Sequence, residues 1–207
     1  MSVNRKKNDL ITQYLQEEGL LALAPFYRES QGSTRVYTLK GEHRDPRSIS
    51  WLLHRLAAYY SIDLPALRRR CGKLLDMRSH ISLPLDAELV LLPVKMRRAR
   101  SPGETTTGYI NLPQVEEIRR APGKLENEKD EPGLSLVIFT GGRELATLNT
   151  PETLRERLRQ GEQVLQDFLK RRYPVPSYAG LKREMVMEIL PPCDCVLKDI
   201  LTRFILM

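Results

Sequence analysis

The chain of 207 residues has 41% hydrophobic and 29% charged residues, a composition typical of a globular protein and not of a disordered or collagen-like chain. No apolar run approaches the roughly 20 residues that a membrane-spanning helix needs, and three cysteines without framework spacing predict reduced thiols in a cytoplasmic protein. The net charge is +7, and residues 35–100 alone carry 14 basic and 6 acidic side chains, which predicts a surface that binds a polyanion.

Two strands and two helices are predicted in the first third of the chain. The strands cover residues 20–24 and 34–39, and a polar loop around Gly32 and Ser33 joins them. Ser48 is the expected N-cap of the first helix, whose apolar residues recur at helical spacing: Ile49, Leu52, Leu53, Leu56 and Tyr60. Asp63 is the expected N-cap of the second helix, whose apolar face comprises Leu64, Leu67, Cys71, Leu74 and Leu75.

The second helix is strongly basic. At 100° per residue, Arg69 and Lys73 point away from its apolar face, while Arg68 and Arg70 flank that face. Residues 56–71 also have the spacing of a helix-turn-helix motif, with Ser61 at the position where glycine is usual. In such a motif the second helix reads base edges in the major groove. The alternative is a pair of packed helices with a basic face toward solvent.

Strands dominate the middle of the chain. Residues 81–85 and 88–94 are expected to form strands, followed by a basic segment that contains Lys95, Arg97, Arg98 and Arg100. Residues 109–118 are expected to form one strand, which Pro113 interrupts and therefore places at a sheet edge. Residues 121–133, with two prolines, two glycines and an acidic run, predict an exposed loop.

A hairpin and a long helix follow. Gly141 and Gly142 separate strands at 134–139 and 144–148, which is typical of a type I′ turn because both of its central residues need a positive φ. Thr150 and Pro151 begin a helix that continues to residue 172, with an inner stripe of Leu154, Leu158, Gly161, Leu165 and Phe168. A last apolar face lies within residues 196–204.

The sequence gives no indication of catalytic or metal chemistry. His43, His54 and His80 are not at metal-ligand spacing, and Cys193 and Cys195 supply only two of the four ligands of a structural zinc site. No nucleophile elbow or phosphate loop is present. We therefore expect a protein that is not an enzyme and holds neither a metal nor a cofactor.

Several short, spaced segments resemble one family. Arg69, Arg70 and Gly72 match a Gly-Arg-Lys-Ala-Gly stretch, and Ser79, His80 and Pro84 resemble a Ser-His-x-Pro segment. An apolar strand that ends at Pro93 and the tripeptide 108–110, which resembles Gly-Trp-Ile, follow in the same order. Over residues 20–173 the chain thus resembles the ComK family of bacterial competence transcription factors. Residues 108–159 also resemble the second half of a LytTR-type DNA-binding domain.

The resemblance implies a single DNA-binding domain over residues 20–173 that binds A/T-rich duplex DNA mainly through the minor groove, as a homodimer or tetramer. Arg97, Arg98 and Arg100, after a strand, suit insertion into a narrow minor groove, and the basic residues Arg68, Arg69, Arg70, Lys73 and Lys95 suit the rest of the interface. In the family, a proteolytic adaptor grips a C-terminal stretch, for which residues 188–193 are the nearest counterpart. The extension 174–207 is therefore expected to be a core, dimer or adaptor-binding helix.

These observations predict an α+β fold with a β-rich core, a helical pair at about 48–75 and a long helix at about 151–172. The expected function is a DNA-binding transcription regulator of ComK type. Two alternatives remain: a helix-turn-helix regulator that reads the major groove with residues 63–75, and a protein-interaction module whose basic face meets an acidic protein.

Overall fold

The computed structural model describes residues 10–28, 31–99, 101–121 and 134–173. The chain divides into two units, Met1–Arg172 and Tyr173–Met207. The fold described below belongs to the first unit. The predicted extension 174–207, with its candidate adaptor and dimer segments, lies outside the described residues. In the described part of the chain, every helix is too short or too polar to cross a membrane.

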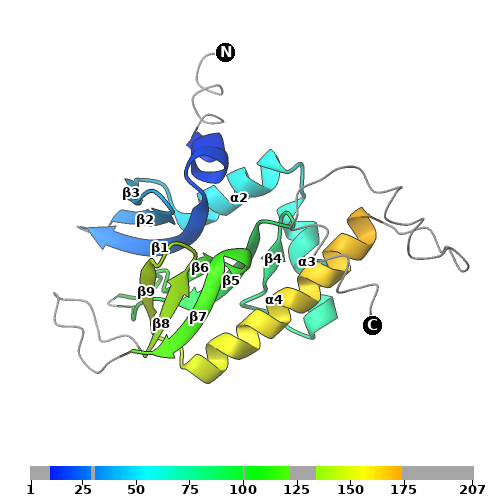
Figure 1. Ribbon diagram of the computed structural model, residues 1–207. Coiled ribbons are helices and arrows are strands. Elements are labelled where there is room, and N and C mark those ends of the chain that lie inside the picture. The colour runs from blue at the N-terminus through cyan, green and yellow to red at the C-terminus, as the bar shows by residue number, and fades with distance from the viewer. Residues whose placement is uncertain (1–9, 29–30, 100, 122–133, 174–207) are drawn as a thin grey trace, which may run out of the picture. The chain divides into compact units, whose positions relative to one another are not determined.

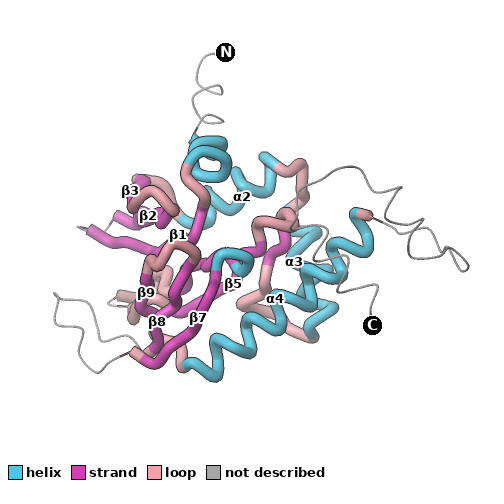
Figure 2. The backbone as a smooth tube through the Cα atoms, in the orientation of Figure 1, coloured by secondary structure: helices cyan, strands magenta, loops and turns pink. Residues whose placement is uncertain are grey.

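The fold is α+β, as predicted, with two antiparallel sheets and a long last helix (Figures 1 and 2). The larger sheet has the order β3-β2-β1-β6-β5-β4, and the smaller sheet has the order β7-β8-β9. The strands are β1 (Leu20–Arg28), β2 (Gln31–Thr38), β3 (Glu42–Asp45), β4 (Leu83–Pro84), β5 (Val90–Lys95), β6 (Thr107–Asn111), β7 (Val115–Arg120), β8 (Ser135–Phe139) and β9 (Glu144–Thr147). The helical elements are η1 (Gln13–Glu17), α2 (Ile49–Tyr59), α3 (Leu64–Leu75), η2 (Leu112–Gln114) and α4 (Pro151–Arg172).

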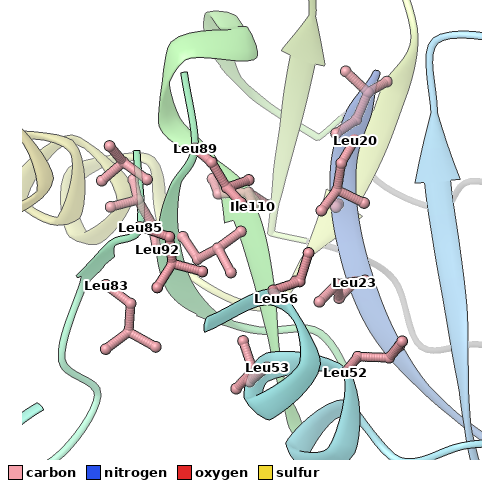
Figure 3. Close-up of a cluster of buried hydrophobic side chains, with 14 of the residues drawn as sticks. Leu20, Leu23, Leu52, Leu53, Leu56, Leu83, Leu85, Leu89, Leu92 and Ile110 are labelled. Carbon is pink, nitrogen blue, oxygen red and sulfur yellow. The ribbon is translucent and has the colours of Figure 1, made fainter. Parts of the chain in front are cut away.

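The two faces of the larger sheet are covered by different helices. Leu23, Tyr109 and Pro93 are register partners and share one face, called the α3 face here because Arg68 of α3 lies beside Tyr109. Leucines of α2 point toward Leu23 in the buried cluster (Figure 3). The opposite face, called the α4 face, carries Ala22, Ile110 and Leu92. On that face α4 packs so closely that a Cβ at Gly161 would collide with Leu92.

The predicted helix starts are confirmed by their caps. The Ser48 hydroxyl accepts a hydrogen bond from the Trp51 N–H (3.2 Å), the Asp63 carboxylate accepts one from the Ala66 N–H (3.0 Å), and the Thr150 hydroxyl accepts one from the Thr153 N–H (3.3 Å). The predicted burial of Leu74 is wrong, because this side chain is 38% exposed. The chain reverses after α3 and covers the helix on the side of Gly72, so that Leu74 is left outside.

Several strand boundaries differ from the prediction, most of all in the hairpin of β1 and β2 and after α3. Gly32 and Ser33 were expected in a loop, but they belong to β2 and pair with Tyr27 and Phe26 of β1. The strand expected over residues 81–85 is reduced to Leu83–Pro84. The strand β3 was not predicted, because its sequence Glu-His-Arg-Asp is short, polar and without apolar alternation.

The single strand expected over residues 109–118 is wrong. The segment forms β6 and β7, which belong to different sheets and are separated by the 3-10 turn η2. Pro113 lies at the start of this turn, where its missing N–H removes no ladder bond. Only β7 is an edge strand, whereas β6 lies inside the larger sheet between β1 and β5.

The hairpin of β8 and β9 is confirmed, but its turn differs from type I′. Gly141 and Gly142 both have positive φ, 82° and 74°. The turn hydrogen bond runs from the Gly142 N–H to the Phe139 carbonyl (2.9 Å), so its central residues are Thr140 and Gly141. A type I′ turn would need a positive φ at Thr140 as well, which Thr140 does not have.

Candidate nucleic-acid interface

The four basic residues of α3 point in three directions. Arg69 and Lys73 are exposed one turn apart, as predicted for the outer side of the helix. Arg68 is partly buried beside Tyr109, where burial raises the pKa of the Tyr109 hydroxyl and the arginine partly offsets that rise. Arg70 turns toward α4, and its Nε lies 3.6 Å from the Asp167 carboxylate. Only Arg69 and Lys73 therefore project outward from α3.

The backbone at both ends of α3 is strained. Ser61, Asp76 and His80 have φ values of 56°, 51° and 53°, and in the described part of the chain they are the non-glycine residues with positive φ. Left-handed backbone is costly for L-residues, and such strain tends to concentrate at functional sites. At Ser61 the conformation is the one that glycine adopts most easily, which agrees with its place in the helix-turn-helix spacing.

The second predicted basic segment follows β5. Lys95 is exposed, and its backbone is fixed by the Asn149 side chain (2.6 Å) and by the Leu148 N–H (2.7 Å). Arg97 forms an ion pair with Glu104 at 2.8 Å, and both side chains are largely buried, 19% and 16% exposed. Arg97 therefore closes the loop that follows β5, while Arg98 is exposed. Arg100 lies outside the described residues.

The structure brings the two basic segments to the same end of the α3 face. Lys95 pairs in register with Thr107, whose hydroxyl lies 3.5 Å from Nε2 of His80. Tyr109, two residues farther along β6, faces the same side and lies beside Arg68. His80 and Tyr109 thus connect α3 to the end of β5. Sequence reasoning did not place them in the site, although both occur in the segments that resemble the ComK family.

Arg157 of α4 anchors the segment after α3. Its guanidinium donates to the His80 carbonyl (2.9 Å) and contacts the Met77 sulfur at 4.0 Å. Burial lowers the pKa of Arg157, which remains a cation because the ordinary value is so high. The position of His80 in the candidate interface therefore depends on α4.

A shallow cationic groove of about 430 Å³ lies between α3 and α4. Arg70, Arg171 and Arg172 contribute its positive charge, and Asp63 contributes one negative charge. Phe168, expected on the inner stripe of α4, lines this groove and is only partly buried. Arg70 thus belongs to the groove and not to the outward-facing side of α3 that carries Arg69 and Lys73.

Two arginine–aromatic clusters lie elsewhere on the larger sheet and α2. Arg47 and Arg55 lie 4.3 Å and 5.8 Å from the ring centre of Trp51. On the α4 face, arginines of β2 and β3 lie over the ring of Phe26. Arg55 follows Trp51 by four residues on α2, a helical spacing that is visible in the sequence, whereas the Phe26 cluster joins three strands and has no local sequence pattern.

Cys71 carries no reactive thiolate at neutral pH. Its side chain is buried in the core, and burial raises the pKa of its thiol to about 11. Within the described ranges, no group of three or more histidine, cysteine, aspartate or glutamate side chains is placed to hold a metal ion.

Comparison with known proteins found no matching family model, no matching curated protein and no matching solved structure.

Proposed function

We propose that this protein is a DNA-binding transcription regulator that contacts duplex DNA with the α3 face. The observation that carries the proposal is the gathering of exposed cations around one end of that face: Arg69, Lys73, Arg78, Lys95 and Arg98. They come from α3, from the turn after it, from the end of β5 and from the loop that follows β5. Clustered cations on one face are the electrostatic footprint of a polyanion-binding protein.

The roles of these cations follow from their positions. Arg69 and Lys73, on the outer side of a rigid helix, suit phosphate contacts, which orient a protein without reading sequence. Arg98, in the loop after β5, suits insertion into the narrow minor groove of A/T-rich DNA, as the ComK resemblance implies. Arg97 is committed to Glu104, so it stabilises the loop that carries Arg98.

A helix-turn-helix regulator is the second candidate. The positive φ of Ser61 between α2 and α3 favours it. However, a recognition helix contacts bases mainly with its N-terminal residues. The exposed residues there are Asp63, which caps the helix, and Pro65, neither of which is a common base reader. We therefore favour the minor groove as the route of sequence recognition.

Fluorescence anisotropy with labelled duplexes tests the proposal. If about four to six phosphates are neutralised, the log–log slope of affinity against salt is expected to be roughly −4 to −5. Replacing Arg69 or Lys73 by alanine should weaken binding to all duplexes and reduce the slope by about 1 each. A duplex affinity that is absent at ~50 mM salt, or that does not change with salt, would contradict DNA binding.

A second comparison distinguishes the two grooves. Arg98→Ala should remove the preference for A/T-rich over G/C-rich duplexes, and a minor-groove drug should compete with the protein. Arg159→Ala, on the exposed side of α4, is the matched control and should leave both properties unchanged. If methylation of guanine N7 blocks binding while the drug has no effect, the helix-turn-helix reading of the major groove is correct instead.

A further inference from the structure

His80 is held in a fixed place at the end of the α3 face. Its backbone has a φ of 53°, a conformation that is costly for most L-residues. Arg157 of α4 supports this conformation, because its guanidinium donates to the His80 carbonyl at 2.9 Å. The segment between α3 and His80 is tied to the helix by the Met77 N–H, which donates to the Gly72 carbonyl at 2.8 Å. The exposed imidazole is therefore carried on a segment that is anchored to both α3 and α4.

Both ring nitrogens of His80 lie near hydroxyl groups. Nδ1 is 3.3 Å from the Ser79 hydroxyl, and Nε2 is 3.5 Å from the Thr107 hydroxyl of β6. A hydroxyl can donate or accept a hydrogen bond, so these neighbours accommodate a neutral imidazole as well as an imidazolium. The ring can therefore gain a proton without losing either contact. Histidine is the side chain whose charge ordinarily changes between about pH 5 and 8.

The charged residues next to these contacts on each element are mostly basic. They are Asp76 and Arg78 in the segment of His80, Lys73 on α3, Lys95 on β5, and Glu156 and Arg157 on α4. The charge of Glu156 is shared with Arg159, at 2.8 Å. Arg78 and Lys95 already belong to the cations proposed to meet DNA. A proton on His80 thus adds one positive charge to that surface.

We propose that His80 is a phosphate contact that acts only when its ring is protonated, so that duplex DNA binds more tightly as the pH falls. An imidazolium donates a charge-assisted hydrogen bond to a backbone phosphate, and the neutral ring lacks that charge. Nε2 is the nitrogen suited to this contact, because its distance to Thr107 is long for a hydrogen bond. A ligand that prefers the protonated form binds more tightly wherever that form is populated. The inference rests on the proposed function, because it takes duplex DNA as the ligand.

Fluorescence anisotropy of the full chain at about pH 5.5 and 8, at equal ionic strength, tests the inference. The wild type should bind a duplex about 3–10 times more tightly at the lower pH, with a log–log salt slope that is steeper by about 1. His80→Asn should bind equally at both pH values, because asparagine tolerates the positive φ and gains no proton. His54→Gln is the matched control and should keep the wild-type dependence, since it removes an exposed histidine of α2 whose Nδ1 lies 2.7 Å from the Ser50 carbonyl.

A second variant separates loss of charge from loss of structure. His80→Lys carries a positive charge at both pH values. It should therefore bind duplex DNA with the same affinity at each, and at about pH 8 it should bind more tightly than His80→Asn. A His80→Lys protein that binds no better than His80→Asn at that pH would contradict a phosphate contact at this position.

Three further results would overturn the inference. If His80→Asn lowers the affinity by the same factor at both pH values, His80 only positions the turn after α3. If the pH dependence persists in His80→Asn or is lost in His54→Gln, another group causes it. A wild type that binds duplex equally at both pH values contradicts the inference and leaves the proposed function intact. A wild type that binds no duplex at either pH contradicts the proposed function, and with it the role of His80.

Discussion

Asp76 shows how the strain around α3 can be measured at a single residue. It follows the last turn of α3 with φ 51° and ψ 45°, and its N–H donates to the Gly72 carbonyl. Its carboxylate lies at the negative end of the helix dipole, and its backbone conformation is one that glycine adopts without strain. The unfavourable position of the charge and the backbone strain each lower the stability slightly, and both occur at this exposed residue.

Asp76→Gly is expected to increase the free energy of unfolding by about 1 kcal/mol, which corresponds to roughly 2–4 °C in the thermal midpoint. Asp76→Asn should give an intermediate gain, because it removes the charge and retains a side chain that tolerates this conformation. Urea denaturation of the three proteins provides the measurement. A loss of stability in Asp76→Gly would mean that the carboxylate itself stabilises the segment that leads to His80.

At the scale of elements, local signals predicted where the helices begin and long-range packing decided the strands. Ser48, Asp63 and Thr150 are capping residues next to apolar helical patterns, and each one caps its helix. The strand β3 has no such signal, since four polar residues become a strand only because β2 offers them an edge. Likewise, Pro113 marks the interruption between β6 and β7, but no local signal shows that the two strands join different sheets.

In the candidate site too, local patterns predicted some features and long-range packing determined the others. The outward direction of Arg69 and Lys73 follows from helical periodicity and was predictable from the sequence. The ion pair of Arg97 with Glu104, the approach of His80 to Thr107 and the Phe26 cluster each join side chains from separate segments. Such contacts depend on strand order and register, which the sequence pattern left open.

The junction of β1 and β6 gives a prediction at this scale. A Cβ at Gly108 would lie 2.5 Å from the Leu23 carbonyl oxygen and would collide with the Met96 side chain. Gly108→Ala should therefore cost about 1–3 kcal/mol of stability, because a strand or Met96 must move. Gly41→Ala is the matched control, with no atom within 4 Å of the added carbon, and should change stability by less than about 0.5 kcal/mol.

Urea denaturation compares the two variants. Equal stability of Gly108→Ala and the wild type would mean that β6 is not packed against β1 as closely as the structure indicates. Met96 immediately precedes Arg97, so a displaced Met96 should also weaken the DNA binding proposed for the loop that carries Arg98.

At the scale of the whole unit, the larger sheet separates two cationic surfaces. The α3 face carries Arg69, Lys73 and Lys95, and the α4 face carries Arg35 and Arg44 over the ring of Phe26. Between the surfaces lies an apolar core that also buries ionisable groups, among them Tyr14 and Cys71. The same core that positions the two surfaces therefore determines how the stability of the protein depends on pH.

Burial raises the pKa of Cys71 from 9.0 to about 11 and the pKa values of Tyr14 and Tyr60 from 10.0 to about 12. The native state therefore keeps protons that the unfolded chain releases in alkali. The stability that these groups contribute is complete below their unfolded pKa values and declines as the pH rises toward the folded values. Above about pH 9, Cys71 should remove up to about 1.4 kcal/mol per pH unit, and above about pH 10 the two tyrosines should add to the decline.

Urea denaturation at about pH 7, 9, 10 and 11 measures this decline, and Cys71→Ala isolates the part due to the thiol. At about pH 7 the variant should be less stable than the wild type, because a buried side chain is truncated. The difference should shrink as the pH rises above about 9, since only the wild type loses the contribution of a protonated thiol. A difference that stays constant over this range would show that Cys71 titrates equally in both states, and hence that the core around α3 admits solvent.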